Sequence, residues 1–183
     1  MRSGGLGVPP ASGGERSDPG RVAGSGPPDQ RNERPSARLA QLGIELPQVI
    51  APLATYVPAV RTGNLVYTAG QLPITGGKLP MVGKVGAEVS ADEAKSLARL
   101  CALNALAAVD SLVGIDSVVR VVKVVGFVAT APGFGGQPGV INGASELFGE
   151  VFGEAGAHAR SAVGVSELPL DAPVEVEVIV EVG

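Results

Sequence analysis

The sequence predicts a two-layer α+β domain in which two helices cover one face of a single β-sheet. Apolar residues recur at helical spacing in two segments, whereas the segments around them are rich in β-branched residues or alternate between apolar and polar residues. Each helix has one apolar side and the last strand has one apolar face. Burying these surfaces together gives one sheet with both helices on the same side.

The first 36 residues of the 183-residue chain differ in composition from the rest. Gly, Pro, Ser and Arg dominate there, and bulky apolar residues are almost absent after Leu6. Such a segment buries too little apolar surface to offset its ordering entropy. We therefore expect a disordered extension over residues 1–36, without the apolar run of a signal peptide, and a single domain over residues 37–183.

The first expected elements of the domain are a short helix and a β-hairpin. A helix over residues 37–42 is predicted because apolar residues there are spaced to share one side. Strands are predicted at 56–61 and 65–72, around a Thr-Gly-Asn turn. Residues 79–84 follow a glycine-rich bend and are predicted to form a short third strand.

Two helices on either side of a long strand are expected next. The tetrapeptide Ser-Ala-Asp-Glu at 90–93 has the capping-box form, so a helix is predicted to begin there and to run to Val113. The β-branched run at 118–130 predicts a strand with at least one buried face. Apolar residues at helical spacing predict a second helix from about 141 to 156.

The last two predicted strands, at about 159–167 and 173–182, are joined by a short turn, so we expect them to be neighbours in the sheet. In the second of them, valines at the even positions point to one face, and three glutamates and an isoleucine point to the other. If the valines meet the helices, the glutamates lie on the open face, in water or in a subunit interface. Arg160 of the first strand then lies beside a column of glutamates.

Composition and charge argue against several classes of function. One His and one Cys provide no Cys/His metal set and no internal disulfide. Residues 39–183 carry eight basic and fourteen acidic side chains, a net charge of about −6. That charge, with few aromatic residues, does not match the basic surface of a nucleic-acid-binding protein. No apolar run reaches the roughly 20 residues that a membrane span needs, so we expect a cytoplasmic protein.

Four residues are candidates for chemistry, and each of them has a structural alternative. Arg160 presents a planar charged fork suited to a carboxylate, or it forms a surface ion pair with a strand glutamate. Glu175 positions or deprotonates water, or lies on a solvated strand face; repulsion from Glu177 would raise one of their pKa values. His158 is a general base or a structural loop residue. Tyr56 lines a site or packs in the core.

Two segments together resemble the signatures of the reactive intermediate deaminase family, also called the Rid or YjgF family. Residues 56–73 are similar to its N-terminal signature, and Arg160-Ser161, Leu168-Pro169 and residues 174–177 to its C-terminal signature. The resemblance covers about residues 50–183. It implies the chorismate-mutase-like fold, a mixed sheet with two helices on one face, assembled as a homotrimer with clefts between subunits.

The resemblance also implies a site in these clefts. In deaminating members the residue that matches Arg160 grips the substrate carboxylate, and the residue that matches Glu175 places the water that attacks an imine carbon. Tyr56 lines the cleft. The implied activity is hydrolysis of a 2-imino or enamino acid, such as 2-aminoacrylate, to a 2-oxo acid and ammonia, with no metal or other cofactor. A non-catalytic trimer that binds small carboxylate metabolites and a ribonuclease are the alternatives.

The chain departs from well-studied deaminases at two positions of these signatures. Ala69 stands where a serine contacts substrate, and Ala162 stands where a cysteine commonly follows Arg-Ser. The run 158–164 and the spacing from Asn142 to Arg160 resemble a separate subgroup. The candidate substrate-binding residues are therefore Tyr56, Ala69, Asn142, His158 and Ser161. Residues that are candidates to supply the contact missing at position 69 are His158, Ser145 and Glu146.

Overall fold

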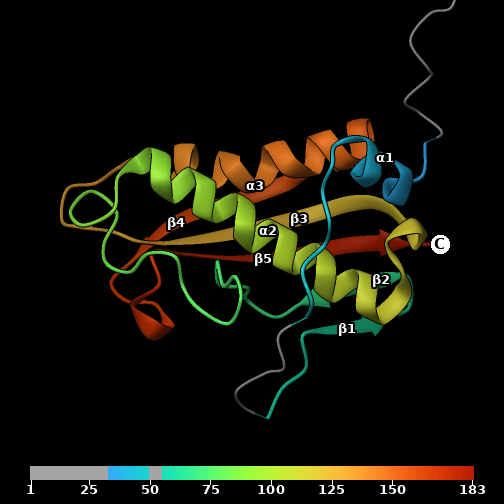
Figure 1. Cartoon of the computed structure of the whole chain (residues 1–183), viewed down its shortest axis with the longest axis horizontal. Helices are drawn as coiled ribbons and strands as arrows, with labels where there is room; N and C mark the ends of the chain where they lie inside the picture. Colours follow the sequence, from blue (N-terminus) through green and yellow to red (C-terminus); the bar gives the residue numbers. More distant parts are fainter. Residues whose placement is uncertain (1–32, 50–54) are drawn as a thin grey trace, which may run out of the picture.

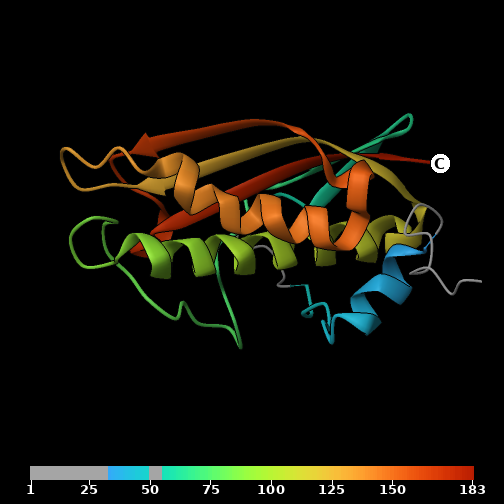
Figure 2. The same cartoon turned by 90° about the horizontal axis from the view of Figure 1, so that it is seen from above.

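The computed structural model describes residues 33–49 and 55–183, which form a five-stranded sheet with two long helices on one face (Figure 1). In chain order the elements are α1 (Pro35–Gln41), β1 (Ala59–Thr62), β2 (Leu65–Thr68), α2 (Ala91–Val113), η2 (Ile115–Ser117), β3 (Val118–Ala129), α3 (Gln137–Phe152), η3 (Gly153–Gly156), β4 (Ala159–Val165), η4 (Pro169–Asp171) and β5 (Val174–Val182). Seen from above, the strands form one layer and α2 and α3 the other (Figure 2). The predicted two-layer α+β class is confirmed.

Most predicted elements are present near their expected positions, with one exception. The capping box at the start of α2 is formed: the Glu93 amide donates to Ser90 Oγ, and the Ser90 amide donates to the Glu93 carboxylate. The strand predicted at residues 79–84 is wrong. Gly83 adopts a φ of 107° there, and its amide donates to the Asp171 carbonyl in a loop. This left-handed backbone interrupts the extended chain.

Residues 1–32 of the predicted extension lie outside the described residues, whereas its last residues belong to the domain. Helix α1 begins at Pro35, two residues before the predicted boundary. The Ser36 amide and hydroxyl donate to the Asp116 carboxylate at 2.8 and 2.7 Å. Arg38 Nε donates to the Glu150 carbonyl of α3 at 2.9 Å. These hydrogen bonds attach α1 to the body of the domain.

The strand order is β1-β2-β5-β3-β4, so the prediction that the last two strands are neighbours is wrong. β3 lies between them, parallel to β4 and antiparallel to β5. The reason is that α3 connects β3 to β4 as a crossover, and strands connected by a crossover helix run parallel. This arrangement places β4 at the sheet edge, and β5 pairs with β3 on the other side of β3. The sheet is therefore mixed, as the family resemblance implies.

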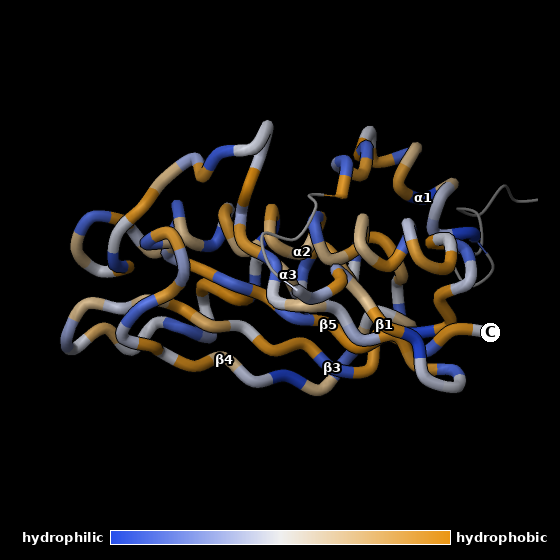
Figure 3. The backbone as a smooth tube through the Cα atoms, turned by 90° about the horizontal axis from the view of Figure 1, so that it is seen from below, coloured by the Kyte–Doolittle hydropathy of each residue, from blue (hydrophilic) through white to orange (hydrophobic). Residues whose placement is uncertain are grey.

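The central position of β5 matches its alternating sequence. Its five valines, at positions 174, 176, 178, 180 and 182, are at most 2% exposed, whereas the residues between them are half-buried. Figure 3 shows the strands as hydrophobic segments interrupted by hydrophilic residues. Burial of a valine contributes roughly 1.5–3 kcal/mol, so a one-residue slip that exchanged valines for glutamates would be costly. The valines therefore face the helices, and the glutamates between them lie on the open face of the sheet.

Glycine and alanine residues allow α3 to pack closely on both α2 and the sheet. A Cβ atom on Gly143 of α3 would lie 1.9 Å from the carbonyl oxygen of Lys95 in α2. A Cβ atom on Gly126 of β3 would lie 2.3 Å from Ile141 Cδ1. Helix α2 adds a buried stripe of mainly alanine residues. The separation between the layers therefore depends on the absence of larger side chains at these contacts.

By length and composition alone, α2 is apolar enough to cross a membrane, which the sequence analysis did not anticipate. In the fold, 56% of its most apolar window is buried, and the helix packs on α3 and β5. A core helix passes the same test of length and composition, because burial on several sides demands apolar residues around most of its circumference.

Gly143→Ala is expected to destabilise the fold, because its methyl group would collide with a backbone oxygen that cannot rotate away. Overpacking of this kind costs roughly 1–3 kcal/mol, so thermal unfolding followed by circular dichroism should show a Tm lower by several degrees. Gly149→Ala on the same helix is the matched control. A Cβ atom there meets nothing within 4 Å and alanine favours helix, so its Tm should stay or rise. Equal losses in both variants would contradict the close packing.

Candidate functional site

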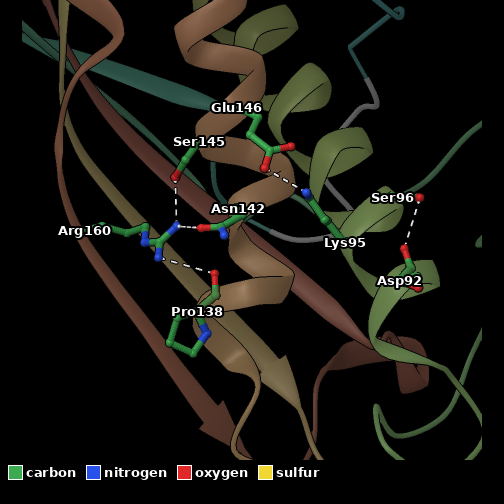
Figure 4. A network of polar contacts seen from close by, with 8 residues as sticks. All are labelled: Asp92, Lys95, Ser96, Pro138, Asn142, Ser145, Glu146 and Arg160. Atoms are coloured by element: carbon green, nitrogen blue, oxygen red, sulfur yellow. Dashed lines mark hydrogen bonds and ion pairs between the residues drawn. The ribbon is translucent and has the colours of Figure 1, made fainter.

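Arg160 lies on the edge strand β4, and its guanidinium reaches across to the side of α3 (Figure 4). Nη1 donates to Asn142 Oδ1 at 2.8 Å and to Ser145 Oγ at 3.1 Å, and Nη2 donates to the Pro138 carbonyl at 3.3 Å. Pro138, Asn142 and Ser145 occupy positions i, i+4 and i+7, which share one side of a helix. Helix α3 therefore holds the fork with three uncharged acceptors.

The charge of Arg160 has no carboxylate partner within residues 33–49 and 55–183. The ion pairs of this part of the chain are Lys84–Glu167, Lys95–Glu146 and Arg99–Glu150. The alternative in which Arg160 pairs with a strand glutamate is therefore wrong for the described residues. Its Nε–H and one N–H of Nη2 also have no acceptor there. Paired N–H donors of this kind match the geometry of a carboxylate.

His158 joins the same group of residues through Ser145. Its Nε2 lies 2.9 Å from Ser145 Oγ, and its Nδ1 lies 2.6 Å from the Gly156 carbonyl oxygen. The imidazole meets the Phe148 ring edge-on, with the ring centroids 5.8 Å apart. The structure thus brings four candidate residues together, which are Arg160, Asn142, Ser145 and His158. We use the name arginine cluster for Pro138, Asn142, Ser145, His158 and Arg160.

Ser161 and Glu175 lie on the other face of the sheet. Arg160 is aligned with Val124, which is fully buried beneath the helices. Adjacent residues of a strand point to opposite faces, so Ser161 points to the open face, where its Oγ accepts a hydrogen bond from Lys123 Nζ at 3.0 Å. Glu175 points the same way, because the valines on either side of it face the helices. Within one chain, the sheet separates Arg160 from Glu175.

Glu175 packs against the segment that follows β2. Gln71 and Val176 exchange two backbone hydrogen bonds, which brings Gly70 alongside Glu175. A Cβ atom on Gly70 would lie 1.7 Å from Glu175 Oε1, so glycine is needed for the carboxylate to lie here. Burial, and secondarily the neighbouring Glu177 carboxylate, raise the pKa of Glu175. This carboxyl group is therefore a stronger base than an ordinary glutamate.

Tyr56 and Ala69 lie near the opposite edge of the sheet from Arg160. Tyr56 precedes β1 and is 53% exposed, and Ala69 follows β2, where its amide donates to the Pro58 carbonyl at 2.8 Å. β1 and β2 occupy one side of the sheet and β4 the opposite edge. Tyr56 and Ala69 therefore lie apart from the arginine cluster of their own chain, and their roles in substrate binding stay predictions.

Sequence reasoning missed part of the arginine cluster. Pro138 contributes a backbone carbonyl, which no side-chain pattern reveals. Ser145 is predicted only as a candidate for the contact missing at position 69, whereas its position three residues after Asn142 is a signal that both side chains share one side of a helix. Glu146 forms an ion pair with Lys95 at 2.7 Å and points away from the cluster (Figure 4). Among the described residues, no three His, Cys, Asp or Glu side chains are grouped to hold a metal ion.

The fold and the arginine cluster define a small α+β protein with an arginine at a sheet edge that pairs with no carboxylate of the described residues. The family model described as "YjgF/chorismate_mutase-like, putative endoribonuclease" matches residues 36–182. The chain therefore belongs to the Rid/YjgF family, and its fold is the chorismate-mutase-like fold that the resemblance implied.

Known relatives cover almost the whole domain. The protein TCP17 of Trypanosoma cruzi is 44% identical over 150 residues, which are 81% of this chain and 94% of TCP17. The structure of Atu1372, of unknown function, from Agrobacterium tumefaciens is 46% identical with a TM-score of 0.75, covering 81% of this chain and 92% of that one. The structure of E. coli TdcF with bound serine is 26% identical with a TM-score of 0.53, covering 75% and 93%.

Glu175→Gln is expected to raise thermal stability near neutral pH. Because the pKa of Glu175 is raised in the folded protein, the folded state binds this proton more tightly than the unfolded state. Stability therefore falls as the pH rises from the usual glutamate pKa through the raised one. The variant lacks this loss, so its Tm should exceed that of the wild type at about pH 7 and approach it at about pH 4.

A second variant checks the cause of this difference. Glu177→Gln removes the smaller of the two contributions to the raised pKa of Glu175, so the pH-dependent loss should shrink without vanishing. A Glu175→Gln protein with a Tm at or below the wild-type value across the whole range would contradict the prediction.

Proposed function

We propose that this protein hydrolyses 2-imino or enamino acids, such as 2-aminoacrylate, to 2-oxo acids and ammonia. Arg160 carries the proposal: it is half-buried, is held by three uncharged oxygens and has no carboxylate partner within the described residues. A fixed guanidinium of this kind favours a small ligand that brings its own carboxylate. The serine bound to E. coli TdcF, a relative with the same fold, supports a ligand of this size and charge.

The proposed site is completed by a second copy of the chain in a cytoplasmic homotrimer. Arg160 and Glu175 of one chain lie on opposite faces of the sheet, and Tyr56 precedes the strand at its far edge. The open face also carries exposed apolar side chains, among them Tyr67 and Val163, which favour burial against another chain. The ligand then lies between Arg160 of one copy and Glu175 and Tyr56 of another.

The proposed reaction needs no covalent intermediate with the protein. Water adds to the electrophilic imine carbon: its oxygen forms the new bond, the C=N π electrons move to nitrogen, and Glu175 takes one water proton and passes it to that nitrogen. Glu175 then takes the hydroxyl proton of the carbinolamine and delivers it to nitrogen, as the carbonyl forms and the C–N bond breaks with its electron pair on nitrogen to release ammonia. A base with a raised pKa suits this exchange, and holding water beside the imine supplies much of the acceleration.

A non-catalytic binding protein for the same carboxylates is the second candidate. Ala69 and Ala162 favour it, because they lack the hydroxyl and thiol found at these positions in well-studied deaminases. The two candidates differ in turnover. Saturable calorimetric binding of a 2-oxo acid, by a preparation that does not accelerate imine hydrolysis, would support the binding protein over the enzyme.

Arg160→Ala is expected to lower kcat/KM roughly 100-fold, since two charge-assisted hydrogen bonds to the substrate are lost. An L-amino-acid oxidase supplies the 2-imino acid, and ammonia release is measured above the spontaneous rate. Arg160→Lys keeps the charge without the planar fork and should be intermediate. Arg99→Ala, which removes an ion pair with Glu150 between the helices, is the control and should keep its activity. Unchanged hydrolysis in Arg160→Ala would reject this role.

Mixing two inactive variants tests the shared site. Arg160→Ala and Glu175→Gln chains are co-expressed with different tags, and the mixed oligomers are purified. If each site takes Arg160 from one chain and Glu175 from the next, every mixed trimer has one intact site in three, so the purified mixed trimers should show about a third of the wild-type rate. No recovery in verified mixed oligomers would show that both residues serve the same site from one chain.

A further inference from the structure

We propose that Ser145 and His158 hold Arg160 in its ligand-binding orientation through a hydrogen-bond chain of fixed direction, in which the neutral imidazole carries its proton on Nδ1. The role in ligand binding rests on the proposed function, because it requires that Arg160 receives a carboxylate. The direction of the hydrogen bonds does not depend on the proposed function.

The direction of the hydrogen bonds follows from the groups at the two ends of the series, which are the Gly156 carbonyl and the Arg160 guanidinium. The Gly156 carbonyl oxygen can only accept, so His158 Nδ1, which lies 2.6 Å away, is the donor. Arg160 can only donate, so its Nη1 donates to Ser145 Oγ at 3.1 Å. In the neutral ring Nε2 is then the acceptor of a hydrogen bond that the Ser145 hydroxyl donates, with Oγ and Nε2 2.9 Å apart. Each hydrogen bond in the chain thus has one donor and one acceptor.

The hydrogen-bond chain holds the side of the guanidinium that faces α3. Ser145 and Asn142 both bind Nη1, whereas the N–H groups without an acceptor in the described residues are on Nε and Nη2. A carboxylate bound at Nε and Nη2 lies on the side of the guanidinium away from Ser145. Ser145 and His158 are therefore positioning residues, and their effect is to keep these donors turned outward.

The imidazole is fixed at its other end by the core. Phe148, which meets the ring edge-on, is fully buried. Gly156 is also buried, and a Cβ atom there would lie 2.3 Å from the Phe148 carbonyl oxygen. This close approach of η3 to α3 sets the position of the carbonyl that binds His158. The orientation of Arg160 is thus connected to the core by three hydrogen bonds in series.

The tautomer can be measured directly by NMR. His158 is the only histidine of the 183-residue sequence, so a ¹H–¹⁵N spectrum of the full-length protein without a histidine tag contains one imidazole. At a pH where the ring is neutral, we expect the pattern of the Nδ1–H tautomer. The Nε2–H pattern would overturn the proposed direction of the chain, whether or not the protein hydrolyses imines.

Carboxylate binding tests the positioning role. With 2-oxobutyrate as the calorimetric probe, Ser145→Ala should bind about 10-fold more weakly than the wild type, because Nη1 loses an acceptor. His158→Gln keeps an acceptor for the Ser145 hydroxyl and should bind more tightly than His158→Leu. Ser96→Ala is the control: this serine donates to the Asp92 carbonyl within α2, and its loss should leave affinity unchanged.

Three outcomes separate this inference from the proposed function. Wild-type affinity in Ser145→Ala, or equal affinities in His158→Gln and His158→Leu, would overturn the positioning role. A wild-type protein that binds no 2-oxobutyrate would remove the proposed ligand and with it the ligand-binding part of the inference. A wild-type protein that binds 2-oxobutyrate but does not hydrolyse imines would reject the proposed enzymatic activity, whereas the weaker binding expected of the variants would still support the positioning role.

Discussion

The valine face of β5 has to be buried beneath two helices, and most of the architecture follows from this requirement. A strand with one fully apolar face is covered along its whole length only if it lies near the centre of the sheet, here between β2 and β3. The crossover through α3 then places β4 on the outer side of β3. Arg160 thereby comes to the sheet edge, next to the side of α3 that presents oxygen acceptors.

The individual elements could be predicted because their signals are local. The capping box at Ser90 and the alternation in β5 each involve residues close together in the sequence. The strand order could not be predicted in this way, since placing β3 between β4 and β5 leaves every local pattern unchanged. Helix α3 begins at Gln137, four residues before the predicted start, because proline is favoured in the first turn of a helix and Pro138 therefore does not prevent the helix from starting there.

The sequence predicts which residues are candidates for the site, because their side-chain chemistry is visible in it, but it does not predict how these residues lie relative to one another. Arg160 and Glu175 are candidates by the chemistry of their side chains, and the family resemblance gives each of them a role. Their separation by the sheet depends on strand order, so the expectation that they lie side by side in one chain was wrong. The support from Pro138 was also invisible in the sequence, since a backbone carbonyl at that point depends on how α3 meets β4.

The uncharged surroundings of Arg160 have a consequence for ligand binding. A half-buried guanidinium beside a carboxylate of its own chain would be neutralised, and an incoming anion would have to displace that partner. Three neutral oxygens instead fix the orientation of the fork, and no carboxylate within residues 33–49 and 55–183 neutralises its charge. In the proposed trimer, an anion that approaches through a subunit interface would meet this charge where water is scarce and the attraction is stronger. In the proposed trimer, carboxylate affinity and subunit assembly are therefore coupled.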